Sequence, residues 1–144
     1  DLWPGRDIEV EIESAQQILG SASELRSALS NLIVNALKYS DGRVTVQWSE
    51  TVVGPALTVE DEGEGIDAKH IPRLTERFYR VDKSRSQSTG GTGLGLAIVK
   101  HVAVSHEAKL FIDSEPGKGS TFRLVFPRDR VALEANLSGA PVAQ

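Results

Sequence analysis

The chain has 144 residues, a formal net charge of −4, and 40% hydrophobic and 25% charged residues, which is typical of one soluble globular domain. The acidic balance argues against a nucleic-acid surface, which is normally basic. The absence of cysteine excludes disulfides, thiolate metal sites and cysteine nucleophiles. No apolar run approaches the ~20 residues of a membrane span. Because the chain opens with Asp1 rather than Met, we expect a piece of a longer protein.

Helical and strand periods alternate along the chain. Ser21 and Glu24 form a capping-box pattern, and apolar residues then recur at helical spacing until the turn signal at residues 40–42. A second helix is predicted over 94–106, and short helical turns over 67–74. Period-two patterns bounded by turn residues predict strands over residues 7–13, 43–50, 56–61, 109–114 and 120–126.

Two segments have no apolar period. Residues 79–92 are polar and rich in Ser and Gly, which predicts a mobile loop. Residues 128–144 predict a flexible C-terminal tail after a domain over 1–127. Because short turns join most strands and the helices are few, we expect an α+β two-layer sandwich, with a mixed sheet of about five strands on about three helices.

A polar stripe lies along the first predicted helix. Asn31, Asn35 and Lys38 are spaced at i, i+4 and i+7, so they share one helix face. An amide oxygen is a suitable ligand for Mg²⁺, and a lysine can neutralise phosphate. The alternative is a solvated polar face. The neighbouring Tyr39 is either a core aromatic or a stacking platform.

Three glycine-containing segments accompany this stripe. Residues 61–65 follow a strand, where the Asp61 carboxylate can accept a hydrogen bond from an exocyclic amine such as that of adenine; alternatively they form an acidic turn. Residues 90–96 lead into a helix and predict an anion site. They match neither a P-loop, since no Gly-Lys-Ser/Thr follows, nor the dinucleotide fingerprint, which needs a third glycine. Residues 117–122 alone indicate only a hairpin turn.

Taken in order, these motifs resemble those of the catalytic ATP-binding domain of sensor histidine kinases, whose Bergerat-type fold with its mobile ATP lid is shared with gyrase-type ATPases and Hsp90. The resemblance extends from about Ser21 to Phe126. Segment 71–83 is most similar to phosphate-regulon sensor kinases. The matching segments are an N box (31–40), a first glycine box (61–65), an F box (76–80), a second glycine box (91–96) and a last glycine box (117–122).

The resemblance implies ATP and Mg²⁺ as cofactors. Asn35 is similar to the magnesium ligand, Lys38 to a phosphate contact and Arg80 to an arginine that reaches the terminal phosphates; these three are the expected catalytic residues. Asp61 resembles the aspartate that accepts from the adenine amine. Tyr39 would stack on adenine, and Phe78 would pin the lid. Further expected ATP contacts are Asn31, Gly63, Gly65, Ile66, Tyr79, Gly91, Thr92, Gly93, Leu94, Gly95, Leu96 and Thr121.

Asn31 separates two branches of this fold. Gyrase-type hydrolases carry a water-activating glutamate four residues before the metal asparagine, and an amide cannot act as a general base. We therefore expect transfer of the γ-phosphate to a histidine on a separate dimerisation domain, as in a two-component kinase. The chain's own histidines, His70, His101 and His106, are interpreted as surface or hydrogen-bonded helix residues. The alternatives are a nucleotide-binding pseudokinase or interaction module without transfer activity, and an ATP-driven clamp.

The resemblance also implies partners and location. The expected partners are the dimerisation domain that carries the phosphoacceptor histidine and, indirectly, a response regulator. We expect no nucleic acid, no membrane contact by this fragment, and a monomer. The expected location is cytoplasmic, within a parent protein anchored in the inner membrane.

Overall fold

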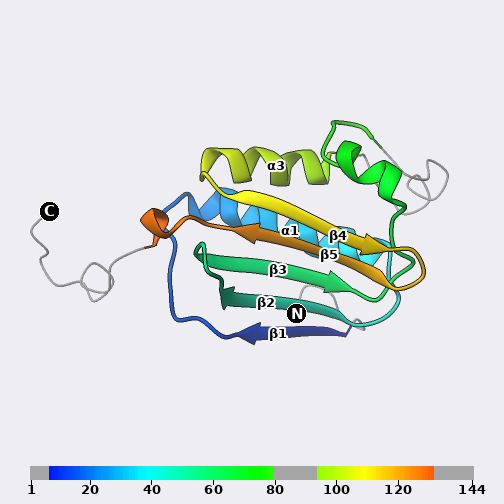
Figure 1. The fold of residues 1–144 in the computed structure, drawn as a ribbon, viewed down its shortest axis with the longest axis horizontal. Coiled ribbons are helices and arrows are strands. Elements are labelled where there is room, and N and C mark those ends of the chain that lie inside the picture. The colour runs from blue at the N-terminus through cyan, green and yellow to red at the C-terminus, as the bar shows by residue number, and fades with distance from the viewer. Residues whose placement is uncertain (1–6, 80–93, 132–144) are drawn as a thin grey trace, which may run out of the picture.

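In a computed structural model, residues 7–79 and 94–131 are described. They contain one five-stranded sheet with the strand order β1-β2-β3-β5-β4 (Figure 1). Its strands are β1 (Ile8–Ile12), β2 (Val44–Glu50), β3 (Pro55–Asp61), β4 (Lys109–Glu115) and β5 (Gly119–Val125). β1 runs parallel to β2 and the other neighbouring pairs are antiparallel, so the sheet is mixed. All five predicted strands are confirmed.

Helices form the second layer. α1 (Ala22–Lys38) packs against β2 and β3, and α3 (Gly95–Ser105) packs against α1 and β4. The 3₁₀ helix η1 (Ala68–Arg73) confirms the predicted short turns, and η2 (Arg128–Arg130) follows β5. The predicted α+β two-layer sandwich is therefore confirmed. No helix in the described ranges combines the length and apolar character needed to cross a bilayer.

The N-terminus of α1 follows the predicted capping pattern. The Ser21 hydroxyl accepts a hydrogen bond from the Glu24 amide at 3.2 Å, which satisfies one of the free N–H groups of the first turn. Lys38 lies in the last turn, where a cation interacts favourably with the helix dipole. The buried face of the helix consists of Ala28, Leu32, Ile33 and Ala36. Because this face is buried, the polar stripe is placed beside the core rather than in it.

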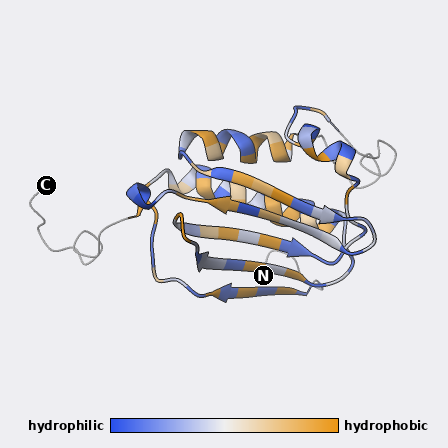
Figure 2. Ribbon diagram, viewed as in Figure 1, coloured by the Kyte–Doolittle hydropathy of each residue, from blue (hydrophilic) through white to orange (hydrophobic). Residues whose placement is uncertain are grey.

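Apolar rows cross the sheet on the face that meets the helices, and the alternation is visible in Figure 2. One row pairs Val46 with Val59 and Val59 with Phe122. A parallel row contains Trp48, Leu57 and Leu124. Phe122 is only 1% exposed, and burial of such a side chain stabilises the fold by roughly 1.5–3 kcal/mol. These rows fix the register of the sheet, because a slip of one residue would turn them to the opposite face.

The chain after β5 is tied to the domain. An Arg128 guanidinium nitrogen lies 3.3 Å from a Glu50 carboxylate oxygen, and Arg130 donates to the Leu19 carbonyl at 3.2 Å. Val131 forms an antiparallel bridge with Ile18. The sequence predicted fraying from Arg128, but residues 128–131 are held by these contacts, which the composition of the segment does not reveal.

Candidate functional site

Asp61 occupies an apolar position in the sheet. It lies two residues after Val59 and therefore on the same, helix-facing side, where it is 5% exposed. The Gly63 amide donates to Asp61 Oδ1 at 2.9 Å. Burial raises the pKa of the Asp61 carboxyl, while hydrogen bonds from the backbone amides of Gly63 and Ser120 lower it and the charge of Glu60 raises it. The group is thus a buried, oriented acceptor for a ligand N–H.

The first glycine box passes between two other parts of the chain. A Cβ on Gly63 would lie 2.1 Å from the carbonyl oxygen of Tyr39, at the end of α1. Gly65 has φ +76°, and a Cβ there would lie 2.2 Å from the carbonyl oxygen of Glu115. Glycine is therefore required at both positions, because any side chain would collide with backbone.

The last glycine box closes on the same loop. The Gly117 amide donates to the Glu64 carbonyl at 2.7 Å. A Cβ on Gly119 would lie 2.1 Å from the Asp61 carbonyl oxygen. The first and last glycine boxes, more than 50 residues apart in the sequence, therefore form one structural unit around Asp61.

The stripe on α1 reaches the start of α3. The side chains of Asn31, Asn35 and Lys38 are half-buried. Asn31 Nδ2 donates to the Ser27 carbonyl at 2.8 Å, and a Cβ on Gly95 would lie 3.0 Å from Asn31 Oδ1. The N box is thus brought against the end of the second glycine box. Arg80, Gly91, Thr92 and Gly93 lie outside the described residues.

One sequence assignment requires correction. Thr121 pairs with Glu60, whereas Ser120 pairs with Asp61. Because neighbouring strand residues point to opposite faces, the Thr121 hydroxyl lies on the face away from the helices. The β5 hydroxyl beside the Asp61 carboxyl belongs to Ser120, which is 6% exposed. Thr121 therefore does not face the pocket that contains Asp61.

Ser114 is a site residue that the motifs did not identify. Its hydroxyl oxygen accepts a hydrogen bond from the Ile66 amide at 2.7 Å and lies 2.7 Å from Ser120 Oγ. It also donates to the Gly119 carbonyl at 3.0 Å. Ser114 thus fixes both glycine boxes to β4. Ser114 lies in the same cross-strand row as Asp61 and Ser120. The sequence could have indicated Ser114 through this row, but the row can be recognised only when the strand pairing is known.

The remaining expected contacts lie on two sides of this unit. Leu94 caps α3, while Leu96 and Ile66 are partly buried against the core. Phe78 is 63% exposed with φ +67°. The hydroxyl of Tyr79 contacts His70 Nδ1.

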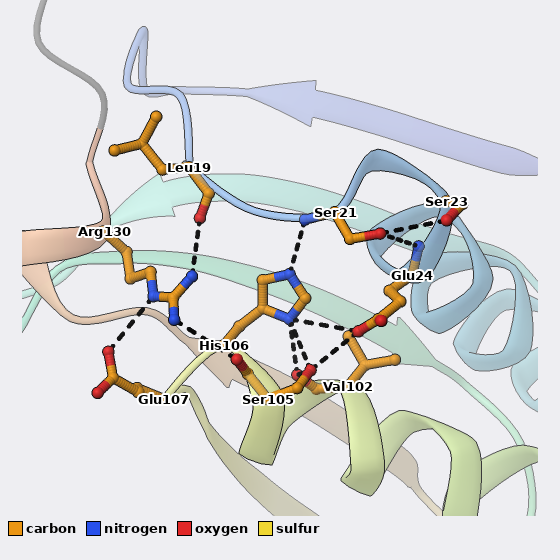
Figure 3. A network of polar contacts seen from close by, with 9 residues as sticks. All are labelled: Leu19, Ser21, Ser23, Glu24, Val102, Ser105, His106, Glu107 and Arg130. Carbon is orange, nitrogen blue, oxygen red and sulfur yellow. Dashed lines mark hydrogen bonds and ion pairs between the residues drawn. The ribbon is translucent and has the colours of Figure 1, made fainter.

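His106 lies between the start of α1 and the C-terminal end of α3 (Figure 3). It is 3% exposed; Nε2 accepts from the Ser21 amide at 3.0 Å, and Nδ1 lies 2.9 Å from the Val102 carbonyl. Because a carbonyl only accepts, Nδ1 carries the hydrogen and the imidazole is fully hydrogen-bonded. The interpretation of His106 as a hydrogen-bonded helix residue is confirmed. Within the described ranges, no group of three or more His, Cys, Asp and Glu could hold a metal ion.

A separate apolar pocket of about 540 Å³ lies beside the first half of α1. Its lining includes Val10, Ile12, Leu25, Leu29 and Trp48. Among the described residues, none of the expected ATP contacts lines this pocket. Its apolar walls offer little to a polyphosphate.

Comparison with known proteins identifies the family of the chain. The family described as "Histidine kinase-, DNA gyrase B-, and HSP90-like ATPase" matches residues 20–130. The phosphate regulon sensor protein PhoR of Pseudomonas aeruginosa is 54% identical over 135 residues, or 91% of this chain and 30% of that protein. The chain therefore spans less than a third of this relative's length.

Solved structures show the same fold. The mycobacterial sensor histidine kinase MprB has a TM-score of 0.72 and 33% identity, covering 84% of this chain and 80% of that one. Full-length ShkA in complex with AMPPNP has a TM-score of 0.73 and 28% identity, covering 85% of this chain and 26% of that one. The expected family and the likeness to phosphate-regulon sensors are confirmed. The chain belongs to the histidine kinase-, DNA gyrase B- and HSP90-like ATPases, within the sensor histidine kinases.

Proposed function

We propose that the chain binds Mg-ATP and transfers the γ-phosphate to a histidine on a separate dimerisation domain of a two-component sensor kinase. The observation that carries this proposal is the position of the N box. Its Asn31 end meets Gly95 at the start of α3, and its Tyr39 end meets Gly63 beside Asp61. About 12 Å of helix separates these ends, so α1 spans the distance between an adenine subsite and a phosphate subsite.

The adenine subsite is centred on Asp61. Its buried carboxylate accepts from the adenine amine, with the Ser120 hydroxyl beside it in place of Thr121. The neighbouring Ser114 holds the loop through the Ile66 amide, so the acceptor is oriented before the nucleotide arrives. GTP carries a carbonyl where ATP carries the amine, which makes this carboxylate selective for ATP.

The phosphate subsite lies along the stripe on α1. Asn35 offers a neutral amide oxygen of the kind that Mg²⁺ accepts, and Lys38 offers a cation to phosphate oxygens. When bound, Mg²⁺ neutralises charge on the phosphates during transfer. The first turn of α3, which begins at Gly95 beside Asn31, presents backbone N–H groups to the same region. Arg80 is assigned to the terminal phosphates by its place in the F box.

Asn31 favours transfer over hydrolysis. Its Nδ2 is occupied by the Ser27 carbonyl, and an amide has no useful basicity toward water. The pocket therefore holds ATP until an imidazole of another domain approaches. The chain spans less than a third of PhoR. We assign the phosphoacceptor domain and an inner-membrane anchor to the proposed parent kinase, and a response regulator is its separate downstream partner.

The test is phosphotransfer in trans. The chain is incubated with γ-labelled Mg-ATP and the cognate dimerisation domain, and acid-labile phosphohistidine is measured on that domain. Asn35→Ala should abolish labelling and the Mg²⁺ dependence of ATP affinity. Ser30→Ala, an exposed substitution on the same helix, should label like the parent.

Three outcomes would contradict the proposal. ATP binding without phosphohistidine would indicate a pseudokinase. Steady hydrolysis by the isolated chain would indicate an ATP-driven clamp. Normal Mg²⁺-dependent binding by Asn35→Ala would remove the metal assignment.

A further inference from the structure

The proposed function does not use the surface around β1, which forms the edge of the described sheet opposite β4 (Figure 1). On the helix-facing side of this strand, Val10 is 62% exposed and Ile12 is 75% exposed. Their partners on β2, Val46 and Trp48, belong to the core or pack against it. Val10 and Ile12 both line the apolar pocket of about 540 Å³ beside α1. The helix layer therefore leaves the apolar face of the sheet open at this edge.

The backbone of β1 has hydrogen-bonding groups beyond those that pair with β2. The Asp7 carbonyl accepts from an amide of β2 at 2.9 Å, and the Glu13 amide donates to a carbonyl of β2 at 2.8 Å. The backbone groups of Asp7 and Glu13 therefore point at β2. Because this direction alternates along a strand, the backbone groups of Val10 and Ile12 point to the outer side, where no described strand lies. Such an edge is a template for a further strand.

The opposite face of β1 is acidic, because Glu9, Glu11 and Glu13 alternate with the apolar residues. Arg43 contacts a Glu9 carboxylate oxygen at 3.0 Å. Within the described ranges, Glu11 and Glu13 contact the neutral amide of Gln47, at 3.3 and 3.1 Å, and form no ion pair with lysine or arginine. Loss of hydration raises the pKa of the Glu11 carboxyl, hydrogen bonding with Glu9 and the charges of Glu9 and Glu13 raise it further, and Gln47 partly offsets this. Added positive charge would therefore be favourable here.

We propose that β1 is the docking strand for an extended polypeptide segment in which apolar residues alternate with lysine or arginine. The segment pairs with the outer backbone groups of Val10 and Ile12 and thereby extends the sheet. Its apolar side chains fall on the helix-facing side and enter the pocket, while its cations fall on the other side, beside Glu11 and Glu13. The same glutamates disfavour a second copy of the chain, because pairing of β1 with β1 would place like charges opposite each other.

The probe is a peptide of about seven residues in which lysine and valine alternate, titrated at low salt into the isotope-labelled chain and followed by NMR amide exchange. At a peptide concentration about ten times the dissociation constant, the outward amides of Val10 and Ile12 should exchange up to about tenfold more slowly. The amide of Glu11 points at β2 and should change less.

Two further peptides separate charge from alternation. The first carries glutamate in place of lysine, and the second has the same composition as the probe but with its valines adjacent. Both should bind at least about fivefold more weakly than the probe, because one reverses the charge that faces Glu11 and Glu13 and the other cannot divide its side chains between two faces.

Variants of the chain test the two faces of β1 separately. Glu11→Gln combined with Glu13→Gln keeps the size of both side chains and should weaken probe binding about two- to tenfold, the effect of two exposed ion pairs. Glu60→Gln, the same change on the same face of β3, is the matched control and should bind like the parent.

Val10→Thr combined with Ile12→Thr keeps two β-branched, strand-favouring side chains but removes apolar surface from the docking face. Because both positions are exposed in the parent, the variant should fold, and its amide spectrum shows whether it does. It should bind the probe at least about threefold more weakly.

Several results would overturn the inference. These are equal affinity for the basic and acidic peptides, unchanged affinity in the Glu11→Gln and Glu13→Gln variant, and binding that leaves the exchange of the Val10 and Ile12 amides unaltered. A dimer of the parent in sedimentation that dissociates in the Val10→Thr and Ile12→Thr variant would assign this face to a second copy instead, and would overturn it equally.

Discussion

Gly95 begins α3 directly against Asn31 of α1, where an added Cβ would lie 3.0 Å from Asn31 Oδ1. Gly95→Ala should leave stability equal or raise it by up to about 1 kcal/mol, since alanine favours helix. The methyl group displaces the Asn31 amide, so Mg-ATP affinity should fall several-fold in calorimetry. In an Asn31→Ala background the same substitution should add little loss. A full additional loss there would show that Gly95 acts independently of Asn31.

Substitutions of Gly65 and Gly117 distinguish the energetic cost of a strained φ from that of a steric collision. Both have positive φ, +76° and +85°, but a Cβ on Gly65 would lie 2.2 Å from the Glu115 carbonyl oxygen, whereas one on Gly117 meets nothing within 4 Å. Gly117→Ala should cost about 1–2 kcal/mol of unfolding free energy, the cost of a left-handed residue. Gly65→Ala should cost clearly more in urea titrations, because backbone must move. Equal costs would contradict the close approach of Gly65 to the Glu115 carbonyl.

Asp61 should lower the stability of the nucleotide-free protein at neutral pH. Burial raises the pKa of its carboxyl, hydrogen bonds from the Gly63 and Ser120 amides partly offset this, and the charge of Glu60 raises it again. A folded-state pKa above the unfolded value means that the contribution of this group to stability is fully present below the ordinary value of 3.8 and is lost as pH rises through the folded pKa.

Asp61→Asn removes this loss while keeping an oxygen for the Gly63 amide. The variant should therefore gain stability relative to the parent as pH rises from about 3 to 7, as measured by urea titration at each pH. Asp113→Asn, the same change at an exposed position on β4, is the matched control. A flat difference across this range for Asp61→Asn would contradict the cost of burying the charge.

Asp61→Ala tests the adenine contact itself. Removal of the acceptor should weaken ATP binding by about 1–3 kcal/mol, because the adenine amine is left without a partner. The binding of inorganic pyrophosphate, which has no base, should change less. If both ligands lost affinity equally, Asp61 would be supporting the loop rather than recognising adenine.

The helical period allows more of this site to be predicted from the sequence than strand alternation does. The spacing of Asn31 and Asn35 fixes their common face once a helix forms, so that stripe was predictable. Strand alternation shows which residues share a face of the sheet only when the strand pairing is known. For this reason the sequence indicated Thr121 as the hydroxyl near adenine, whereas the register places Ser120 beside Asp61. The contact between His70 and Tyr79 involves the residue that follows Phe78, whose positive φ no local pattern indicates.

His106 should stabilise the ends of α1 and α3 without contributing to nucleotide binding. His106→Leu removes the acceptor of the Ser21 amide at the start of α1, in a place where a Cβ on Gly20 would already lie 2.3 Å from the ring. An unsatisfied buried N–H costs about 1–3 kcal/mol, which urea titration would detect. His101→Leu, on the exposed face of α3, should unfold like the parent. Because Asn31 lies about 15 Å of helix from Ser21, folded His106→Leu should bind Mg-ATP with parental affinity; a selective loss of binding with unchanged stability would show instead that the two helix ends are coupled to the site.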